Sequence, residues 1–124
     1  IEDESVIGDN TVIGSNTTIS NNTSKGNNCS ISSNIHIYNN CKIGNNCIIH
    51  SGTVIGSDGF GFVTENGTHH KIPQNGNVII GDNVEIGSNC ALDRGTIGDT
   101  IVEDQCKLDN HVHLAHNVDR KSVV

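Results

Sequence analysis

The sequence contains no Met and no Trp, and its 124 residues include only one Tyr, two Phe and one Pro. A core built from this chain therefore depends on Ile, Val, Leu and small residues, because large aromatic side chains are nearly absent. Basic residues are also scarce, and the formal net charge is −7. This charge disfavours nucleic acid as a partner, since phosphate binding needs clustered Lys and Arg.

Long apolar runs are missing as well, so no transmembrane segment is expected. No secretory signal is recognisable, and because the chain begins with Ile1 rather than Met, we expect the native start to lie elsewhere. No Cys-x-x-Cys pair occurs among the five Cys, which argues against a zinc site of that kind.

What the sequence does have is a period of six residues. One column of this repeat is entirely Ile apart from Lys25: Ile1, Ile7, Ile13, Ile19, Ile31, Ile37, Ile43, Ile49 and Ile55. A second column, four residues later, holds small side chains apart from Ile35: Ser5, Thr11, Thr17, Thr23, Cys29, Cys41, Cys47 and Thr53. A third column, one position before the second, holds Asn10, Asn16, Asn22, Asn28, Asn34, Asn40, Asn46 and Gly52.

The period is neither that of a helix nor that of a long strand, and it fits a short strand followed by a turn. The Ile and small columns are expected to point inward. The Asn and Gly column is expected at positive φ, which these residues adopt at little cost. Three such faces would close a triangular coil of roughly 18 residues, and the coils would stack at roughly 4.8 Å as a solenoid.

Residues 57 to about 77 interrupt the repeat and are predicted to form a loop at one corner, because glycines and Pro73 punctuate them. The repeat resumes at Ile80, and two later spacings of five residues, Leu92 to Ile97 to Val102, predict tightened corners. Arg120 falls in an inward slot, so either the register changes there or the end is irregular.

All five Cys are expected to be buried, reduced thiols, since disulfides between stacked coils would need an oxidising compartment. The trimeric γ-class carbonic anhydrases, a related β-helix family, bind zinc through three His, and His111, His113 and His116 suggest the same here. However, His111 and His116 belong to successive corners and His113 to a face, which disfavours convergence on one metal. His36, His50, His69 and His70 are expected to be solvated. An exposed imidazole at the His116 corner can act as a general base near neutral pH.

Several segments resemble the UDP-3-O-acylglucosamine N-acyltransferases of lipid A synthesis, which are hexapeptide-repeat acyltransferases. They are Val54-Ile55-Gly56-Ser57-Asp58-Gly59-Phe60-Gly61-Phe62, Lys71-Ile72-Pro73-Gln74, Val84-Glu85-Ile86-Gly87, Asp93-Arg94-Gly95, Lys107-Leu108-Asp109-Asn110 and Ala115-His116-Asn117-Val118. The resemblance covers roughly residues 50 to 118, and the earlier hexads are compatible with it. It implies an all-β fold, the left-handed parallel β-helix, because the period itself does not set the handedness.

The resemblance also implies a function. A cytoplasmic homotrimer of a Gram-negative-type bacterium would move a 3-hydroxyacyl group from acyl carrier protein to the 2-amino group of UDP-3-O-acylglucosamine, a UDP-sugar lipid precursor. The carrier thioester is the donor substrate, and no cofactor or metal is implied. His116 matches the catalytic base, Asp109 matches the carboxylate that orients it, and Asn110 is expected near the reacting groups.

Two further predictions concern geometry. Asp109 and His116 lie seven residues apart, on successive corners, so they are expected to meet only across a subunit boundary of a trimer. The exposed aromatics Phe60 and Phe62, on a Gly-rich loop, are candidate substrate-binding residues, although they could instead pin the loop to the helix wall.

The chain also departs from the family pattern. His113 replaces a frequent Gln, and Asp119-Arg120-Lys121-Ser122 replaces a segment that usually contains Ile-Gly. No counterpart of the family's N-terminal nucleotide-binding domain, further coils or C-terminal helices is recognisable. Residues 1–124 are therefore expected to be a partial β-helix domain that is inactive by itself.

Two further alternatives remain open beside the zinc enzyme. The first is another hexapeptide enzyme, such as an O-acyltransferase or a coenzyme A-dependent acetyltransferase. The second is a non-catalytic solenoid, such as an ice-binding or cell-surface β-helix. An ice-binding surface would need a flat outer Thr array, whereas the Thr column here is predicted to point inward.

Overall fold

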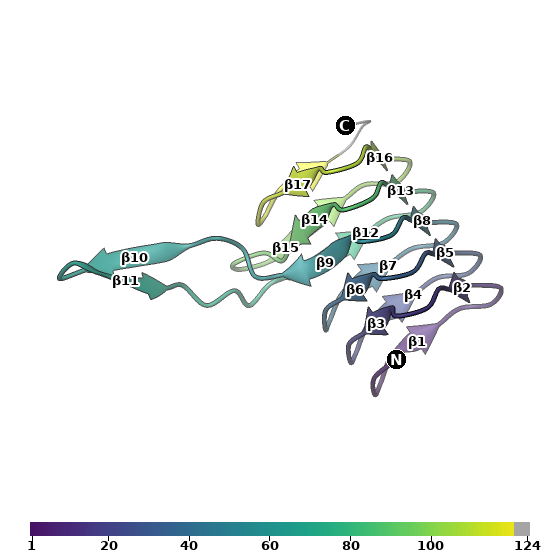
Figure 1. Cartoon of the computed structure of the whole chain (residues 1–124), viewed down its shortest axis with the longest axis horizontal. Coiled ribbons are helices and arrows are strands. Elements are labelled where there is room, and N and C mark those ends of the chain that lie inside the picture. The colour runs from purple at the N-terminus through teal and green to yellow at the C-terminus, as the bar shows by residue number, and fades with distance from the viewer. Residues whose placement is uncertain (121–124) are drawn as a thin grey trace.

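The computed structural model describes residues 1–120, and in that range the chain is all β, with eighteen strands and no helix. Sixteen strands form three parallel sheets, which are the three walls of a prism, and the other two form a projecting hairpin (Figure 1). The protein is therefore a left-handed parallel β-helix, as the resemblance implied.

The walls are named here faces A, B and C in the order in which the chain visits them. Face A comprises β1 (Val6–Ile7), β4 (Ser24–Lys25), β7 (Lys42–Ile43), β12 (Asn77–Ile80), β15 (Asp99–Val102) and β18 (Asp119–Arg120). Face B comprises β2 (Val12–Ile13), β5 (Ser30–Ile31), β8 (Ile48–Ile49), β13 (Glu85–Ile86) and β16 (Lys107–Leu108). Face C comprises β3 (Thr18–Ile19), β6 (His36–Ile37), β9 (Val54–Ser57), β14 (Ala91–Asp93) and β17 (His113–Leu114). The hairpin is β10 (Phe62–Glu65) with β11 (Thr68–Lys71).

The Ile column forms the core. Ile13 pairs with Ile31 and Ile31 with Ile49, so each partner lies 18 residues further along the chain. Ile31 and Ile49 are at most 1% exposed, as are most central members of the column. Ile1 is the exception at 72% exposed, because it precedes the first strand and has no wall beneath it.

The corners follow the predicted chemistry. Every Asn of the third column, together with Gly52, has a positive φ between 56° and 83°. The corner between faces A and B is further joined by a ladder: the side-chain oxygen of Asn45 accepts a hydrogen bond from the backbone N–H of Asn27, and Asp82 accepts from Asn45, each at 2.8 Å. Each coil thus completes the hydrogen bonding of its neighbour.

The small column also lies inside. The Thr53 hydroxyl donates to the Gly87 carbonyl at 2.7 Å, and the Cys47 thiol donates to the Gly81 carbonyl at 3.1 Å. All five Cys are buried and unpaired, as predicted. Burial raises the pKa of the Cys47 thiol to about 11, so this thiol stays protonated and inert at neutral pH.

Two expectations about the later coils need correction. Ile97 is 86% exposed, while Leu92 and Val102 are both fully buried. The ten-residue step from Leu92 to Val102 therefore contains one lengthened corner rather than two tightened ones. Arg120 pairs with Val102, so the register does not change there, and its side chain is exposed on β18. Lys121 and Ser122 lie outside the described residues.

Lys25 is the one charged residue in the Ile column, and it is only 3% exposed. Its Nζ has no hydrogen-bond partner within the described part of the chain. Burial lowers the pKa of this ammonium from 10.5 to about 8, because the interior disfavours the charged form.

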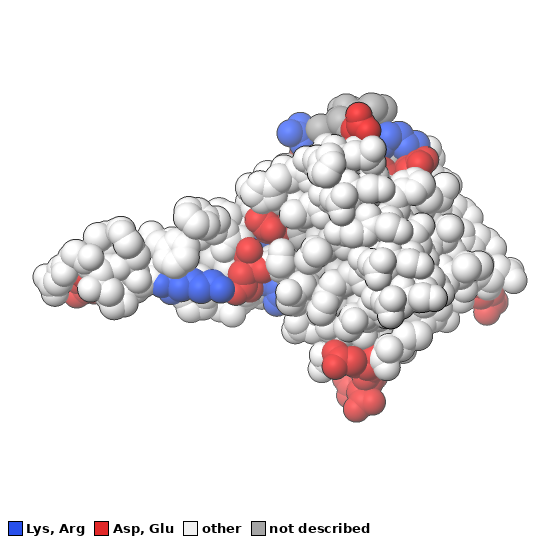
Figure 2. Space-filling model, viewed as in Figure 1, with Lys and Arg blue, Asp and Glu red and all other residues white. Residues whose placement is uncertain are grey.

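Charged side chains are sparse on the face shown in Figure 2, and acidic ones gather at its lower edge, by the first coil. No helix long and apolar enough to cross a membrane occurs among residues 1–120.

Candidate functional site

The interruptions of the repeat share one corner, at which the chain passes from face C to face A and which is here called the C/A corner. In an early coil, this passage takes six residues, from Ile37 to Ile43. In the next coil, the hairpin insertion lies in this passage, between β9 and β12. In the coil after that, the passage is the lengthened segment between β14 and β15 (Figure 1). His116 occupies the same corner in the next coil, between β17 and β18. The corner therefore brings an insertion and an exposed imidazole together.

His116 is an exposed turn residue next to Asn117, which has a φ of 62°. Its Nδ1 lies 3.2 Å from the hydroxyl oxygen of Thr96. The start of the insertion lies directly against it, because a Cβ at Gly59 would be 2.9 Å from the Cβ and 3.0 Å from the Cδ2 of His116. Only a glycine fits between the loop and this imidazole without displacing one of them.

Thr96 is in turn bonded to the far end of the insertion. Its hydroxyl donates to Oε1 of Gln74 at 2.8 Å, and Nε2 of Gln74 donates to the Ile72 carbonyl at 3.0 Å. Gln74 is only 7% exposed. Neither residue was given a role from the sequence, although Gln74 belongs to a segment, Lys71 to Gln74, that carries the family resemblance.

Asp109 and Asn110 lie elsewhere, at the corner between faces B and C. Oδ1 of Asp109 accepts a hydrogen bond from the Asn110 N–H at 2.7 Å, and Oδ1 of Asn110 accepts from the Ser88 N–H at 2.7 Å. A groove of about 400 Å³ at this place is lined by His50, Glu85, Gly87, Lys107, Leu108, Asp109 and Asn110. No hydrogen bond joins Asp109 to His116 within residues 1–120, so one chain brings Asp109 and Asn110 together but not Asp109 and His116.

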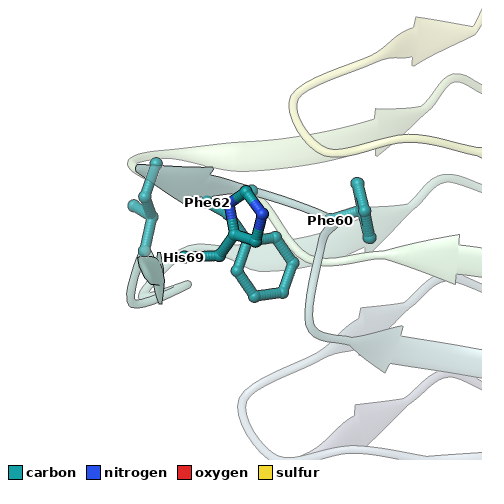
Figure 3. Close-up of a pocket in the computed structure, with 5 residues that line it drawn as sticks. Phe60, Phe62 and His69 are labelled. Atoms are coloured by element: carbon teal, nitrogen blue, oxygen red, sulfur yellow. The ribbon is translucent and has the colours of Figure 1, made fainter. Parts of the chain in front are cut away.

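Phe60 and Phe62 lie on the projecting insertion, with exposures of 84% and 46%. Their rings pack edge to face with centroids 5.1 Å apart. With Gly61, His69 and Ile72 they line an apolar pocket of about 630 Å³ (Figure 3). The alternative that these residues pin the loop to the wall is wrong for Phe60, whose ring is largely in solvent.

Other histidines have carboxylate partners that sequence reasoning missed. Nε2 of His113 lies 2.8 Å from Oδ2 of Asp93, and Nε2 of His50 lies 2.8 Å from Oε2 of Glu85. Each pair joins neighbouring coils on one face. Pairing the outward residues of neighbouring coils would therefore have predicted these contacts from the sequence. Within residues 1–120, no group of three or more His, Cys, Asp or Glu is arranged to hold a metal ion.

Curated relatives match about half of the chain. The chain is 44% identical over 67 residues to the UDP-3-O-acylglucosamine N-acyltransferase of Hydrogenovibrio crunogenus, which is 54% of this chain and 19% of that protein. It is 50% identical over 66 residues to the enzyme of the same name from Fusobacterium nucleatum, which is 53% of this chain and 20% of that protein. The match thus spans about a fifth of the length of these relatives.

Solved structures match nearly the whole chain. The UDP-N-acetylglucosamine acyltransferase of Bacteroides fragilis has a TM-score of 0.83 and 32% identity, covering 98% of this chain and 46% of that one. The UDP-N-acetylglucosamine acyltransferase of Francisella novicida has a TM-score of 0.82 and 28% identity, covering 94% of this chain and 42% of that one. The homologues and structural neighbours are thus acyltransferases.

Two family descriptions also match. Residues 26–57 match the bacterial transferase hexapeptide (six repeats). Residues 5–39 and 77–114, more than half of the chain, match the hexapeptide repeat of succinyl-transferase. With its stacked hexads, its Asn corners and its exposed His116 beside the inserted hairpin, the chain belongs to the hexapeptide-repeat transferase family.

Proposed function

We propose that this β-helix belongs to an N-acyltransferase that moves a 3-hydroxyacyl group from acyl carrier protein to the 2-amino group of UDP-3-O-acylglucosamine. The observation that carries the proposal is the position of His116, an exposed imidazole at the C/A corner, next to the aromatic insertion. The names of the curated relatives support the acceptor, and the sequence resemblance supports the carrier-protein donor.

His116 serves as the general base of this reaction. The amine nitrogen of the acceptor attacks the thioester carbonyl, and a C–N bond forms as the C–S bond breaks. The imidazole takes the proton that the nitrogen loses and then returns a proton to the departing thiolate of the carrier. No cofactor is needed, because the thioester already supplies an activated acyl group.

The aromatic pocket of the insertion binds an apolar part of a substrate. Phe60 presents a mostly solvated ring, and the pocket of about 630 Å³ that it lines has the size typical of small-ligand sites. Burying such a ring against an acyl chain stabilises the complex by removing apolar area from water. Phe60 and Phe62 are therefore assigned to substrate binding.

Asp109 acts on the same reaction from a second copy of the chain. Because it lies at the B/C corner and His116 at the C/A corner, the two residues can face each other only between copies, as in a homotrimer. There the carboxylate stabilises the imidazolium that forms during the reaction, and Asn110 contacts the reacting groups through its free amide nitrogen. The enzyme works in the cytoplasm, where carrier-protein thioesters are available.

A second function is favoured by the solved structures, which are named UDP-N-acetylglucosamine acyltransferases and match up to 98% of this chain. In that case the acceptor atom is an oxygen rather than an amine nitrogen. The two functions use the same fold, and the acceptor distinguishes them.

The test compares wild type and His116→Ala in the full-length protein, with 3-hydroxyacyl carrier protein as donor. Loss of a general base should lower the rate of N-acylation of UDP-3-O-acylglucosamine by about 10² to 10⁴. His113→Gln is the matched control, because it changes an exposed imidazole on the adjacent strand and should keep most of the activity. Acylation of UDP-N-acetylglucosamine alone would favour the second function, and full activity of His116→Ala would remove His116 from the mechanism.

A further inference from the structure

Three segments that are distant in sequence meet at the C/A corner: the end of the insertion at Gln74, the lengthened corner at Thr96, and the next coil at His116. We propose that Gln74 and Thr96 form a positioning relay that holds His116 in the tautomer with a proton on Nδ1 and a free lone pair on Nε2. The catalytic consequence of the relay rests on the proposed function, whereas the tautomer itself does not.

The direction of the relay follows from counting protons. A Thr hydroxyl has one proton to donate, and the carbonyl oxygen of a Gln amide can only accept. Oε1 of Gln74 lies 2.8 Å from the Thr96 oxygen, so the hydroxyl proton must lie between these two atoms. The Thr96 oxygen then has only lone pairs left for His116. At 3.2 Å from that oxygen, Nδ1 must carry the proton that joins them.

The orientation of the Gln74 amide is fixed independently. Its Nε2 donates to the Ile72 carbonyl at 3.0 Å. If the amide were turned over, two carbonyl oxygens would face each other at Ile72, and the Gln74 N–H would instead donate to the Thr96 oxygen. Because Gln74 is only 7% exposed, water cannot easily rescue the turned arrangement. The orientation of the buried Gln74 amide therefore determines the tautomer of the exposed His116.

The relay is also held in place at each member. The backbone N–H of Thr96 donates to Oδ1 of Asn117 at 2.9 Å, which ties the lengthened corner to the coil that carries His116. A Cβ at Gly59 would lie 2.9 Å both from Oε1 of Gln74 and from the Cβ of His116. The insertion thus packs against both ends of the relay at one glycine.

The chosen tautomer is the one that a base facing the substrate needs. Nε2 of His116 has no hydrogen-bond partner within residues 1–120, and the side chain is exposed. With the proton on Nδ1, the Nε2 lone pair can accept the proton that the attacking amine loses. In the other tautomer, Nε2 would present its own N–H to the amine and could not act as the base.

This assignment differs from orientation of the ring by Asp109. A carboxylate from a second copy could bind Nδ1 only after displacing Thr96, since the Thr96 oxygen already occupies that position. The relay therefore predicts that the tautomer depends on Gln74 and Thr96 and does not depend on Asp109.

The experiment is ¹H–¹⁵N NMR of the full-length protein labelled at histidine, which reports which ring nitrogen of His116 carries the proton. His116 is assigned by the loss of its signals in His116→Ala. Wild type and Thr96→Ser should show Nδ1–H, and Thr96→Val should show a mixture of tautomers. Gln74→Met should shift the population toward Nε2–H, because the freed Thr96 hydroxyl can then donate to Nδ1. Asp109→Asn should leave the proton of His116 on Nδ1.

Kinetics complete the test. Gln74→Met, which favours the wrong tautomer, should lower kcat by about 10- to 100-fold with little change in KM. Thr96→Val, which leaves a mixture, should lower kcat less, and Thr96→Ser should keep most of the rate. Nε2–H in the wild type, or the same tautomer in wild type, Thr96→Val and Gln74→Met, would overturn the relay. If wild type shows the predicted tautomers but acylates neither UDP-sugar, the relay stands and the proposed function fails.

Discussion

Residues 1–55 and residues 56–120 build the same walls but differ at one corner. In the first region every corner takes the minimal step, closed by an Asn or Gly at positive φ in nearly every case. In the second region the C/A corner takes a 25-residue step from Ile55 to Ile80 and a ten-residue step from Leu92 to Val102. Every residue of the proposed relay belongs to this irregular corner. The repeat supplies the scaffold and carries His116, and its interruptions supply the residues that contact His116.

The two regions are also bonded differently. At the C/A corner of the first region, the Asn22 amide donates to Oδ1 of Asn40, the same position one coil away, at 2.8 Å. At the C/A corner of the second region, Arg94 joins unlike positions: its Nε donates to the Gly56 carbonyl at 2.6 Å, and its Nη2 donates to Oδ1 of Asn39 at 3.1 Å. Arg94 therefore ties the irregular corner to the regular coils, and its low exposure of 9% fits this structural role.

The largest effect on stability should come from replacing Ile by Ala in the core of the regular region, compared with the same replacement at the C/A corner of the second region. Ile49→Ala removes a fully buried side chain from the regular core and should lower the free energy of unfolding by about 2 to 5 kcal/mol. Ile97→Ala removes a side chain that is 86% exposed at the C/A corner and should change it by less than about 0.5 kcal/mol. Urea unfolding monitored by circular dichroism measures both. Equal losses would contradict the placement of Ile97 outside the core.

A smaller effect of opposite sign, a gain in stability, is expected at Lys25, which interrupts the Ile column of the regular region. Lys25→Ile completes the Ile column and removes a buried, unpartnered ammonium, so it should raise the free energy of unfolding at pH 7 by about 1 to 3 kcal/mol. Lys25→Met is the matched variant that keeps most of the side-chain length. A loss of stability in both variants would show that the amine has a partner the fold needs.

The pH dependence of this gain has a definite sign. Because the pKa of Lys25 is lowered from 10.5 to about 8 in the folded protein, the unfolded chain binds more protons between these values. The penalty from Lys25 is complete below pH 8 and fades as the pH rises toward 10.5. The stability difference between Lys25→Ile and wild type should therefore shrink over this range. Burial also raises the pKa of the Cys47 thiol to about 11, so the thiol contributes a pH dependence of its own to the free energy of unfolding. This contribution is common to both proteins, and it cancels when their stabilities are compared at the same pH.

The smallest effect on stability should come from the projecting insertion. Phe60→Ala should change the free energy of unfolding by less than about 0.5 kcal/mol, since the ring is 84% exposed. The KM for UDP-3-O-acylglucosamine or for the acyl carrier protein should nevertheless rise about tenfold, as expected when an apolar contact to a ligand is lost. Val63→Ala is the control, because Val63 is 54% exposed on the same insertion but does not line the pocket. An unchanged KM for both substrates would remove Phe60 from the binding site.

The walls could be predicted from the sequence because their residues repeat a local rule. Each Ile occupies the same environment as the Ile one coil away, and each corner Asn meets the same backbone requirement, so one pattern defines many positions. The prediction failed at Ile97, which lies five residues from both Leu92 and Val102 and therefore resembles a member of the core column. Periodicity alone cannot distinguish such a residue from a core position.

The candidate site was predictable only in part. His116 and Asp109 stood out through their motif, and their separation on different corners followed from the period. Gln74 and Thr96 were missed because their partnership joins an insertion to a lengthened corner, and no spacing along the chain encodes that contact. The packing of Gly59 against both Gln74 and His116 is likewise visible only in three dimensions.

The pairing of Ile43 with Ile80 has a consequence for protein engineering. These two residues are far apart along the chain, yet they stack in the same register as Lys25 and Ile43 do one coil earlier. Wall register is therefore independent of how many residues the C/A corner contains, and the entropic cost of lengthening a loop grows only slowly, by about 0.6 kcal/mol per doubling. A foreign peptide with adjacent ends, grafted between Ser57 and Asn77, would be displayed away from an unaltered prism. This corner is thus an attachment point at which an inserted segment leaves the register of the walls unchanged.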